Sequence, residues 1–386
     1  MSGTDQYSLK TFQGAAGLEQ LKPHWQGLTR TLASPGFYHC AEWYEAYLAW
    51  LEDDPDSFHF YSVFDESGRL VAVFPLKRCV RRFLGIRFHS LELLRHGHLP
   101  LADAVLPPTD RACAIWRFFL EQLRRQSDEC WDFIRLSKLP EDSALFSVLP
   151  KTTGLNVLQN RIQACFYCRR ASAEDLSRRL SKSFRKSLRN ARNRLSALGE
   201  PSFFSARTAA ETESLFQELL TVEASGWKGR AGTAIANSPQ TTKFYQKLIE
   251  AFGPADCALD ALRVENKTIA VTFGLKTGKT VYSIKIGIDD QYRRYSPGHL
   301  LTQYALTQTG SPSEPDVINF AGETPRLLRW KPDVMDLYDV YVFNATVKAK
   351  IAFAQVALKH QLVRLYRRVG KPLVKRLQRD PVKNIA

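Results

Sequence analysis

The chain has 386 residues, of which 44% are hydrophobic and 24% are charged. This length exceeds the roughly 250–300 residues at which one hydrophobic core stops growing, so we expect two domains and exclude a largely disordered chain. The net charge of +15 is concentrated in residues 169–200, with ten basic and three acidic residues (+7), and in residues 345–386, with eleven and one (+10). The remaining chain carries −2, which argues against a general DNA-binding surface.

Cysteine usage and hydropathy point to a cytoplasmic protein. The seven cysteines are odd in number and scattered among apolar runs, which is typical of free thiols in a reducing compartment. Cys165 and Cys168 lack further ligands nearby, and so do His96 and His98, so we expect no metal. The N-terminus is polar, and no stretch approaches the ~20 apolar residues of a spanning helix. Only the basic segments offer a route to the inner face of a membrane.

The pattern of apolar runs and turn residues predicts the same order of elements twice. The first half is expected to contain a helix, a hairpin, a third strand, a helix and a fourth strand, at residues 42–50, 58–64, 70–76, 84–93, 111–125 and 131–136. The second half repeats them at residues 210–223, 258–264, 268–274, 280–288, 297–308 and 316–320. A repeat of this kind predicts two α/β domains with mixed sheets, at residues 1–168 and 201–344.

The two basic segments are each predicted to form one amphipathic helix. Apolar residues recur every three or four positions from Leu176 to Leu198, before Gly199 and Pro201 end the pattern. A similar stripe runs from Val347 to Val369. Each helix can pack on its own domain. Alternatively, the first contacts an anionic substrate or surface, and the second contacts an anionic membrane or a protein partner.

One segment has the features of a ligand-binding site. It runs from a strand through a basic turn into a helix that begins at Ser296-Pro297-Gly298. Ser296 is expected as the N-cap and Pro297 as the first helical residue. The first amides of such a helix have no intrahelical partners and bind phosphate oxygens. Gly298 permits close backbone approach, and Arg293 and Arg294 can add charge-assisted hydrogen bonds. The segment predicts a pyrophosphate site.

This segment resembles motif A of GNAT acyltransferases. Over about residues 30 to 345, the chain is similar to the tandem CelD/BcsL-like acetyltransferases found near bacterial cellulose and exopolysaccharide genes. Further matching positions are Glu42, Trp43, Asp103, residues 131–136, 185–194 and 223–229, Phe244, Tyr245, Lys285, Tyr292, Gly322 and Trp330. Two positions depart from the family pattern: Asn319 replaces a common acidic residue, and Arg326-Leu327 replaces Tyr-Lys.

The resemblance implies two GNAT-like domains in tandem, the first of them degenerate because residues 96–103 replace the phosphate-binding turn. The second domain would bind acetyl-CoA or another acyl-CoA as co-substrate. The donor-binding residues implied are Ile286, Gly287, Ile288, Arg293, Arg294, Ser296, Pro297, Gly298 and His299. A backbone amide in the strand at 286–288 would polarise the thioester carbonyl.

The resemblance also implies catalytic and acceptor-binding residues. Glu223 would accept the proton of the nucleophile, Lys285 would face the cofactor or acceptor, and Tyr338 would protonate the departing thiolate. Trp227 and Lys228 would bind the acceptor. Three alternatives stay open: Glu223 as a helix-surface carboxylate, Trp227 as a core aromatic residue, and Lys285 as a lysine that reaches solvent from a strand end.

Three functions follow from the sequence. The first is transfer of an acyl group from acyl-CoA to an amine or hydroxyl of a sugar-containing or small-molecule acceptor, linked to exopolysaccharide or cellulose biosynthesis. The second is a FemAB-like ligase that uses aminoacyl-tRNA, in which the basic helix before Gly199 contacts RNA. The third is a non-catalytic scaffold, an alternative that the departures at Asn319 and Leu327 leave open.

Overall fold

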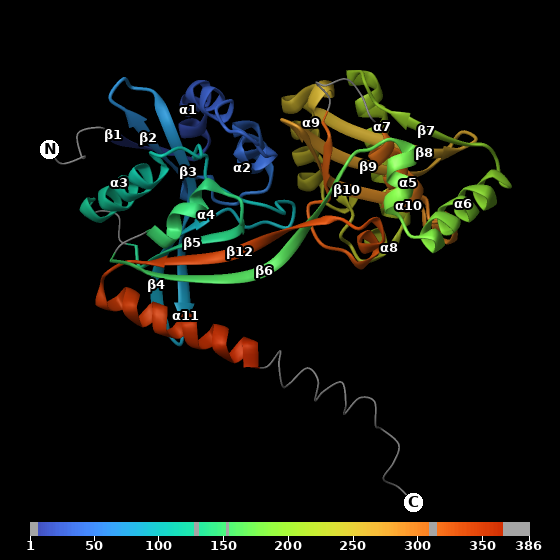
Figure 1. The fold of residues 1–386 in the computed structure, drawn as a ribbon. Coiled ribbons are helices and arrows are strands. Elements are labelled where there is room, and N and C mark those ends of the chain that lie inside the picture. The colour runs from blue at the N-terminus through green and yellow to red at the C-terminus, as the bar shows by residue number, and fades with distance from the viewer. Residues whose placement is uncertain (1–6, 127–130, 152–153, 309–314, 366–386) are drawn as a thin grey trace, which may run out of the picture.

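The described strands form one mixed sheet. The computed structural model describes residues 7–126, 131–151, 154–308 and 315–365. Its sheet has twelve strands in the order β1-β2-β3-β4-β5-β12-β6-β11-β10-β9-β8-β7, with helices packed against it on both halves (Figure 1). The predicted mixed α/β class is confirmed.

The first half contains every element predicted for it. Its helices and strands are β1 (Tyr7–Gln13), α1 (Gly14–Thr29), α2 (Ala41–Trp50), β2 (Phe58–Asp65), β3 (Leu70–Phe83), β4 (Ile86–Leu93), α3 (Ala112–Arg125), β5 (Phe133–Pro140), α4 (Ala144–Val148) and β6 (Asn156–Arg169). Strand β3 is longer than predicted. The structure adds β1, α1, α4 and the full length of β6.

The second half also has its predicted elements. They are α5 (Ala173–Arg179), α6 (Lys182–Ser196), β7 (Pro201–Ser205), α7 (Ala209–Ser225), α8 (Trp227–Arg230), α9 (Pro239–Asp256), β8 (Cys257–Val264), β9 (Lys267–Thr277), β10 (Thr280–Ile288), α10 (Pro297–Thr307), β11 (Val317–Asn319), β12 (Asp333–Phe343) and α11 (Val347–Leu365). The third strand, β10, and the start of α10 lie where the sequence placed them.

The prediction of one helix between residues 169 and 199 is wrong. Strand β6 extends to Arg169, and the helical part is split into α5 and α6. Leu180 is extended between them, with φ −81° and ψ 149°, and the Ser181 hydroxyl accepts from the Phe184 amide and caps α6. The apolar spacing was correct, because Phe184 and Leu188 are buried against the second half of the sheet. A serine N-cap interrupts the helix without changing its buried face.

Strand β12 joins the two halves. It comes from the end of the chain but pairs antiparallel with both β5 and β6, over Asp333–Phe343 on the β6 side. Helices α2 and α9 also meet across the junction, where the Trp43 and Phe244 rings lie 5.0 Å apart at 90°. The domain boundaries at 168, 200 and 344 stay predictions. The structure adds that the strand nearest the last boundary lies among strands of the first half.

Helix α11 packs on the first half, but not through the stripe that the sequence singled out. Ala349, Ala352 and Val356 are buried against a cluster that includes Phe88 and Phe343. The predicted stripe faces outward instead, and its members include Val347, Ile351, Leu358 and Leu362, which are 75%, 41%, 52% and 56% exposed. Small side chains let the helix approach the sheet closely. The rest of the predicted tail, residues 366–386, lies outside the described residues.

We expect Asp339 to fix β12 against β5. This buried carboxylate accepts from Arg135 Nη2 at 2.6 Å and from the Ser137 hydroxyl. Asp339→Ala would leave the Arg135 guanidinium buried without its counter-charge and lower the free energy of unfolding by about 3 kcal/mol. Urea denaturation followed by circular dichroism measures it.

The matched control is Asp316→Ala, which removes the exposed partner of Arg169. Exposed ion pairs contribute about 0–1 kcal/mol, so this variant should unfold close to the wild-type midpoint. Equal midpoints for the two variants would contradict the role given to Asp339.

Candidate active site

The sheet opens beside β10 in the second half. Strand β11 pairs with β10 only over Thr280–Tyr282, whereas β9 pairs with it to Ile288. The register between β9 and β10 shifts between Ser283 and Lys285, which marks a β-bulge. A bulge bends and twists a strand. The far end of β10 therefore has a free edge toward α10, and a ligand can reach its backbone.

A cavity of about 450 Å³ lies at this free edge. It is lined by Glu223, Gly226, Trp227, Lys228, Ile286, Gly287, Ile288, Asp290, Arg293, Ser296, Pro297, Gly298, His299, Thr324 and Arg326. These come from α7, α8, β10, the turn before α10, the start of α10 and the segment after β11. The fold thus brings together eight of the nine predicted donor-binding residues and both predicted acceptor-binding residues.

The start of α10 differs from the predicted cap. Ser296 occupies the N-cap position in a left-handed conformation, with φ 53°, and its side chain caps no amide. Its carbonyl accepts from the amides of His299 and Leu300. Gly298 precedes these two donors, so its amide has no intrahelical acceptor. The Ser296 hydroxyl and the Gly298 amide are therefore available at the positive end of the helix dipole.

Gly298 lies close to two isoleucine side chains of β10. A Cβ at this position would lie 2.8 Å from Ile288 Cδ1 and 3.5 Å from Ile286 Cδ1. The glycine therefore leaves room for these isoleucine side chains between α10 and β10. Gly287 has a similar role on the other face, where a Cβ would lie 3.0 Å from the Glu223 amide nitrogen. The role of Gly298 in close backbone approach to a phosphate stays a prediction.

Glu223 is a buried carboxylate whose oxygens are both engaged. Lys228 Nζ lies 2.6 Å from Oε1, and the Ile235 amide donates to Oε2 at 2.8 Å. Lys228 Nζ also donates to the carbonyl of Ile286 at 2.9 Å. Glu223 is 2% exposed, so it is not a helix-surface carboxylate. The network ties α7 and α8 to the free edge of β10.

Lys285 lies on the α7 and α9 face of β10 and is not among the residues that line the cavity. Burial lowers the pKa of its ammonium group to about 8; the charge of Glu223 raises this pKa, and the charge of Lys228 lowers it further. The ammonium nitrogen lies 5.6 Å from the centre of the Tyr245 ring. Lys285 therefore does not simply extend to solvent. Near neutral pH it can gain or lose a proton.

Arg326 is a lining residue to which the sequence analysis gave no role. It forms no ion pair or hydrogen bond with any part of the chain that the structure describes, and burial lowers the pKa of its guanidinium. An arginine without a counter-charge in a cavity wall is suited to an anionic ligand. Its signal in the sequence was the departure from the family pattern, which identified the position but not its contacts.

His299 is held in one orientation beside Arg326. Trp330 Nε1 donates to His299 Nδ1 at 3.2 Å, so the proton of the neutral ring is on Nε2. Burial, with the charges of Arg326 and Arg329, lowers the pKa of His299 to about 4. At neutral pH the ring therefore offers a neutral N–H donor.

Three other predicted residues are placed as follows. Trp227 is 55% exposed at the rim of the cavity and is therefore not a core aromatic residue. Arg294 turns away from the cavity and donates to its neighbour's hydroxyl, Tyr295 Oη, at 2.7 Å. Tyr338 lies in β12, where its ring packs 4.7 Å from Phe146 of α4. Neither Arg294 nor Tyr338 lines this cavity.

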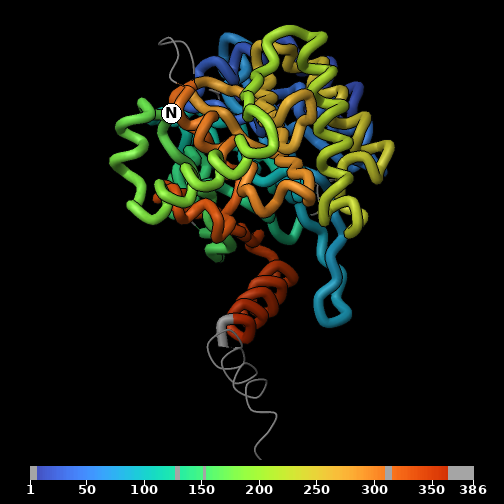
Figure 2. Tube along the Cα trace, turned by 90° about the vertical axis from the view of Figure 1, so that its right-hand side faces the viewer, coloured from blue at the N-terminus to red at the C-terminus, as the bar shows by residue number. Residues whose placement is uncertain are grey.

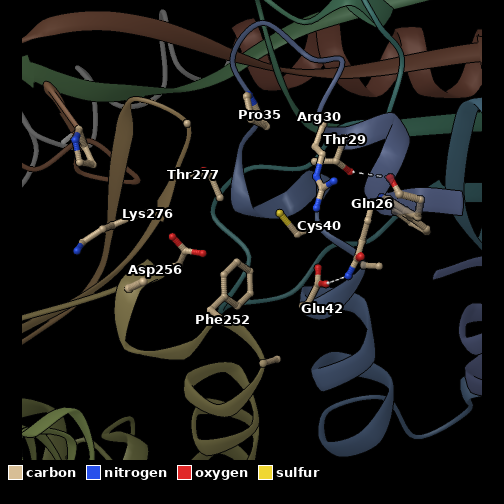
Figure 3. A pocket seen from close by; sticks show the side chains of 16 residues that line it. Gln26, Thr29, Arg30, Pro35, Cys40, Glu42, Phe252, Asp256, Lys276 and Thr277 are labelled. Carbon is tan, nitrogen blue, oxygen red and sulfur yellow. Dashed lines mark hydrogen bonds between the residues drawn. The ribbon is translucent and has the colours of Figure 1, made fainter. Parts of the chain in front are cut away.

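Another cavity, of about 490 Å³, lies between α1, the start of α2 and the end of α9 (Figure 3). Its wall includes Glu42, which accepts from Gln26, and also Asp256, Lys276 and Thr277. Thr277 lies at the opposite end of β10 from Gly287. Thr277 pairs with Thr280, seven residues before Gly287, and because a strand rises about 3.3 Å per residue, roughly 23 Å separate this cavity from Gly287. It is therefore not where a donor held at α10 could react.

One family model matches part of the second half. Residues 182–311, which are 130 of the 386, match the family model of the acetyltransferase (GNAT) domain. That match supports a transferase enzyme. The matched range contains all the lining residues except Thr324 and Arg326.

Solved structures extend the likeness to both halves. FemX has a TM-score of 0.57 at 10% identity, covering 84% of this chain and 96% of its own. L-PGS from Bacillus licheniformis has a TM-score of 0.51 at 13% identity, covering 86% and 95%. No curated protein matches the chain in sequence. At these identities the likeness concerns the fold, which is a tandem GNAT-like arrangement.

We expect the Lys285 ammonium group to titrate with a midpoint near 8. Glu223→Gln should lower this midpoint, because it removes the charge that favours the protonated amine. Lys228→Met should raise it, because it removes a like charge. The 13C shift of the Lys285 ε-carbon, assigned by its loss in Lys285→Met, measures the midpoint. A midpoint near 10, the ordinary value for lysine, or shifts in the same direction in both variants, would contradict this environment.

Proposed function

We propose that the chain is an acyltransferase that takes its acyl group from acyl-CoA bound in the cavity at the start of α10. The observation that supports this most is the convergence of two arginines, Arg293 and Arg326, with the start of α10 at the free edge of β10. Phosphates are bound by such combinations of cations and helix N-termini. A cavity of about 450 Å³ can hold part of such a donor.

The acyl end of the donor would lie along the free edge of β10. Amides on this edge beyond Tyr282 are not paired with β11, so they can donate to the thioester carbonyl as negative charge develops on its oxygen. The Lys228 contact with the Ile286 carbonyl would keep this edge in place. Much of the rate would come from holding donor and acceptor together.

Proton transfer would involve Lys285 together with Glu223. An acceptor amine would attack the thioester carbon, the C–S bond would break with its electron pair on sulfur, and the amine would lose a proton. Neutral Lys285 can accept that proton through water, because its side chain does not line the cavity, whereas each Glu223 oxygen already accepts one hydrogen bond, from Lys228 or from the Ile235 amide. We therefore assign Glu223 first to positioning. Tyr338 has no part in this proposal.

The acceptor would enter past Trp227. Its exposed ring at the rim can stack on the face of a sugar, and Lys228 lies one residue further on. This supports the expected sugar-containing or small-molecule acceptor. We also propose that the chain is a member of the CelD/BcsL-like group and that its reaction is linked to exopolysaccharide biosynthesis.

Transfer from aminoacyl-tRNA is the second candidate. Helix α6 turns its basic side chains to solvent, among them Arg185, Lys186 and Arg189. It lies beside the turn before α10, where Arg194 Nη2 approaches the Arg294 carbonyl at 3.5 Å. Such a row of cations next to the donor cavity suits a nucleic-acid backbone.

Replacing Arg326 and, separately, Arg294 distinguishes direct binding of the donor in the cavity from a general attraction between the donor and nearby positive charges. Arg326→Met should weaken CoA binding about tenfold, because a charge-assisted hydrogen bond contributes about 1.5–3 kcal/mol. The matched control, Arg294→Met, removes a cation near the same turn that does not line the cavity, and should change affinity less than about threefold. Calorimetric titration with CoA measures both.

Equal losses in the two variants would indicate nonspecific attraction and contradict the proposed donor site. If the wild-type protein binds aminoacyl-tRNA with strong salt dependence but does not bind CoA, the second candidate replaces the first.

A further inference from the structure

The hairpin between β3 and β4 ends in an unusual pair of residues. Leu84 and Gly85 form its tip, both with positive φ, 45° and 83°. Two-residue turns of this kind favour Asn-Gly, and a left-handed conformation costs a leucine about 1–2 kcal/mol. Leu84 is also 83% exposed. Neither the turn nor the core therefore explains a leucine at this place.

The strands that flank this tip also expose apolar and basic side chains. Val80 and Ile86 are 58% and 37% exposed. Arg82 and Arg87 are direct cross-strand partners, both exposed, and neither forms an ion pair with the described parts of the chain. Residues 77–91 contain no Asp or Glu. The tip is thus apolar, with cations immediately behind it.

Helix α11 presents a second surface of the same kind beside the hairpin. It packs against Phe88 of β4 and exposes Ile351, Leu358 and Leu362. Lys359 is exposed next to this stripe, and residues 340–379 contain no Asp or Glu. Figure 2 shows the hairpin and α11 extending from the same end of the molecule.

We propose that the hairpin tip and the outer face of α11 together dock the protein on an anionic lipid bilayer. The two elements are far apart in the sequence, yet both combine exposed apolar side chains with cations. Insertion of apolar side chains and attraction of Lys and Arg to anionic headgroups are additive. The two projections lie at the same end of the molecule, and the anionic headgroups of a bilayer match the cations on both.

Docking of this kind is independent of the proposed reaction, because none of these residues lines the donor cavity. It would hold one end of the first half at the membrane.

The test uses the full chain and vesicles of 70% phosphatidylcholine and 30% phosphatidylserine, with pure phosphatidylcholine as the comparison. Co-sedimentation should occur only with the anionic vesicles and fall at high salt, because charge attraction is screened. Arg82→Gln with Arg87→Gln should weaken binding by about tenfold or more.

Leu84→Asn tests the apolar tip without threatening the fold, because asparagine is favoured at positive φ. It should reduce vesicle binding severalfold and leave thermal stability equal or higher, and Leu358→Ser should add to the loss. Leu198→Ser is the matched control, since Leu198 is 45% exposed on another part of the surface. The proposal is overturned by equal binding of both vesicle types, by equal loss in the control, or by self-association that depends on Leu84 and Leu358.

Discussion

The antiparallel pairing of β12 with both β5 and β6 is the contact on which the rest of the architecture depends. It places the last strand of the chain between two strands of the first half and makes a single sheet from two repeated units. Ladder pairing runs along both edges of β12, and Asp339 adds a charged side-chain link to Arg135. Strand β6 pairs with β12 on one edge and with β11 on the other. Its position therefore determines where β11 lies, and so where the pairing of β11 with β10 ends.

The candidate active site follows from that opening. Strand β11 is only three residues long, so β10 extends beyond it and its edge past Tyr282 is not paired with β11. Glycines at 287 and 298 allow α7 and α10 to approach this edge from opposite faces. The buried pair of Glu223 and Lys228 then joins α7 and α8 to the carbonyl of Ile286. The cavity is therefore a consequence of packing, with charges placed where water is partly excluded and electrostatic effects are larger.

The two ends of the molecule use basic residues differently. In the cavity, burial lowers the pKa values of His299 and Arg326, and on the other face of β10 it lowers the pKa of Lys285. On the hairpin and α11, exposed cations stand next to exposed apolar side chains. No helix in the described part of the chain is long and apolar enough to cross a membrane.

The sequence by itself determined the order of elements, the strand-turn-helix segment at 280–307 and most of the residues around the cavity, because periodicity, capping and turn chemistry are local properties. Tertiary structure alone decided the partners of β12, the outward face of α11, the exposure of Trp227 and the placement of Tyr338 against Phe146. It also gave Arg326 its place in the cavity. These depend on which distant surfaces meet, and the pattern of a single segment does not encode that.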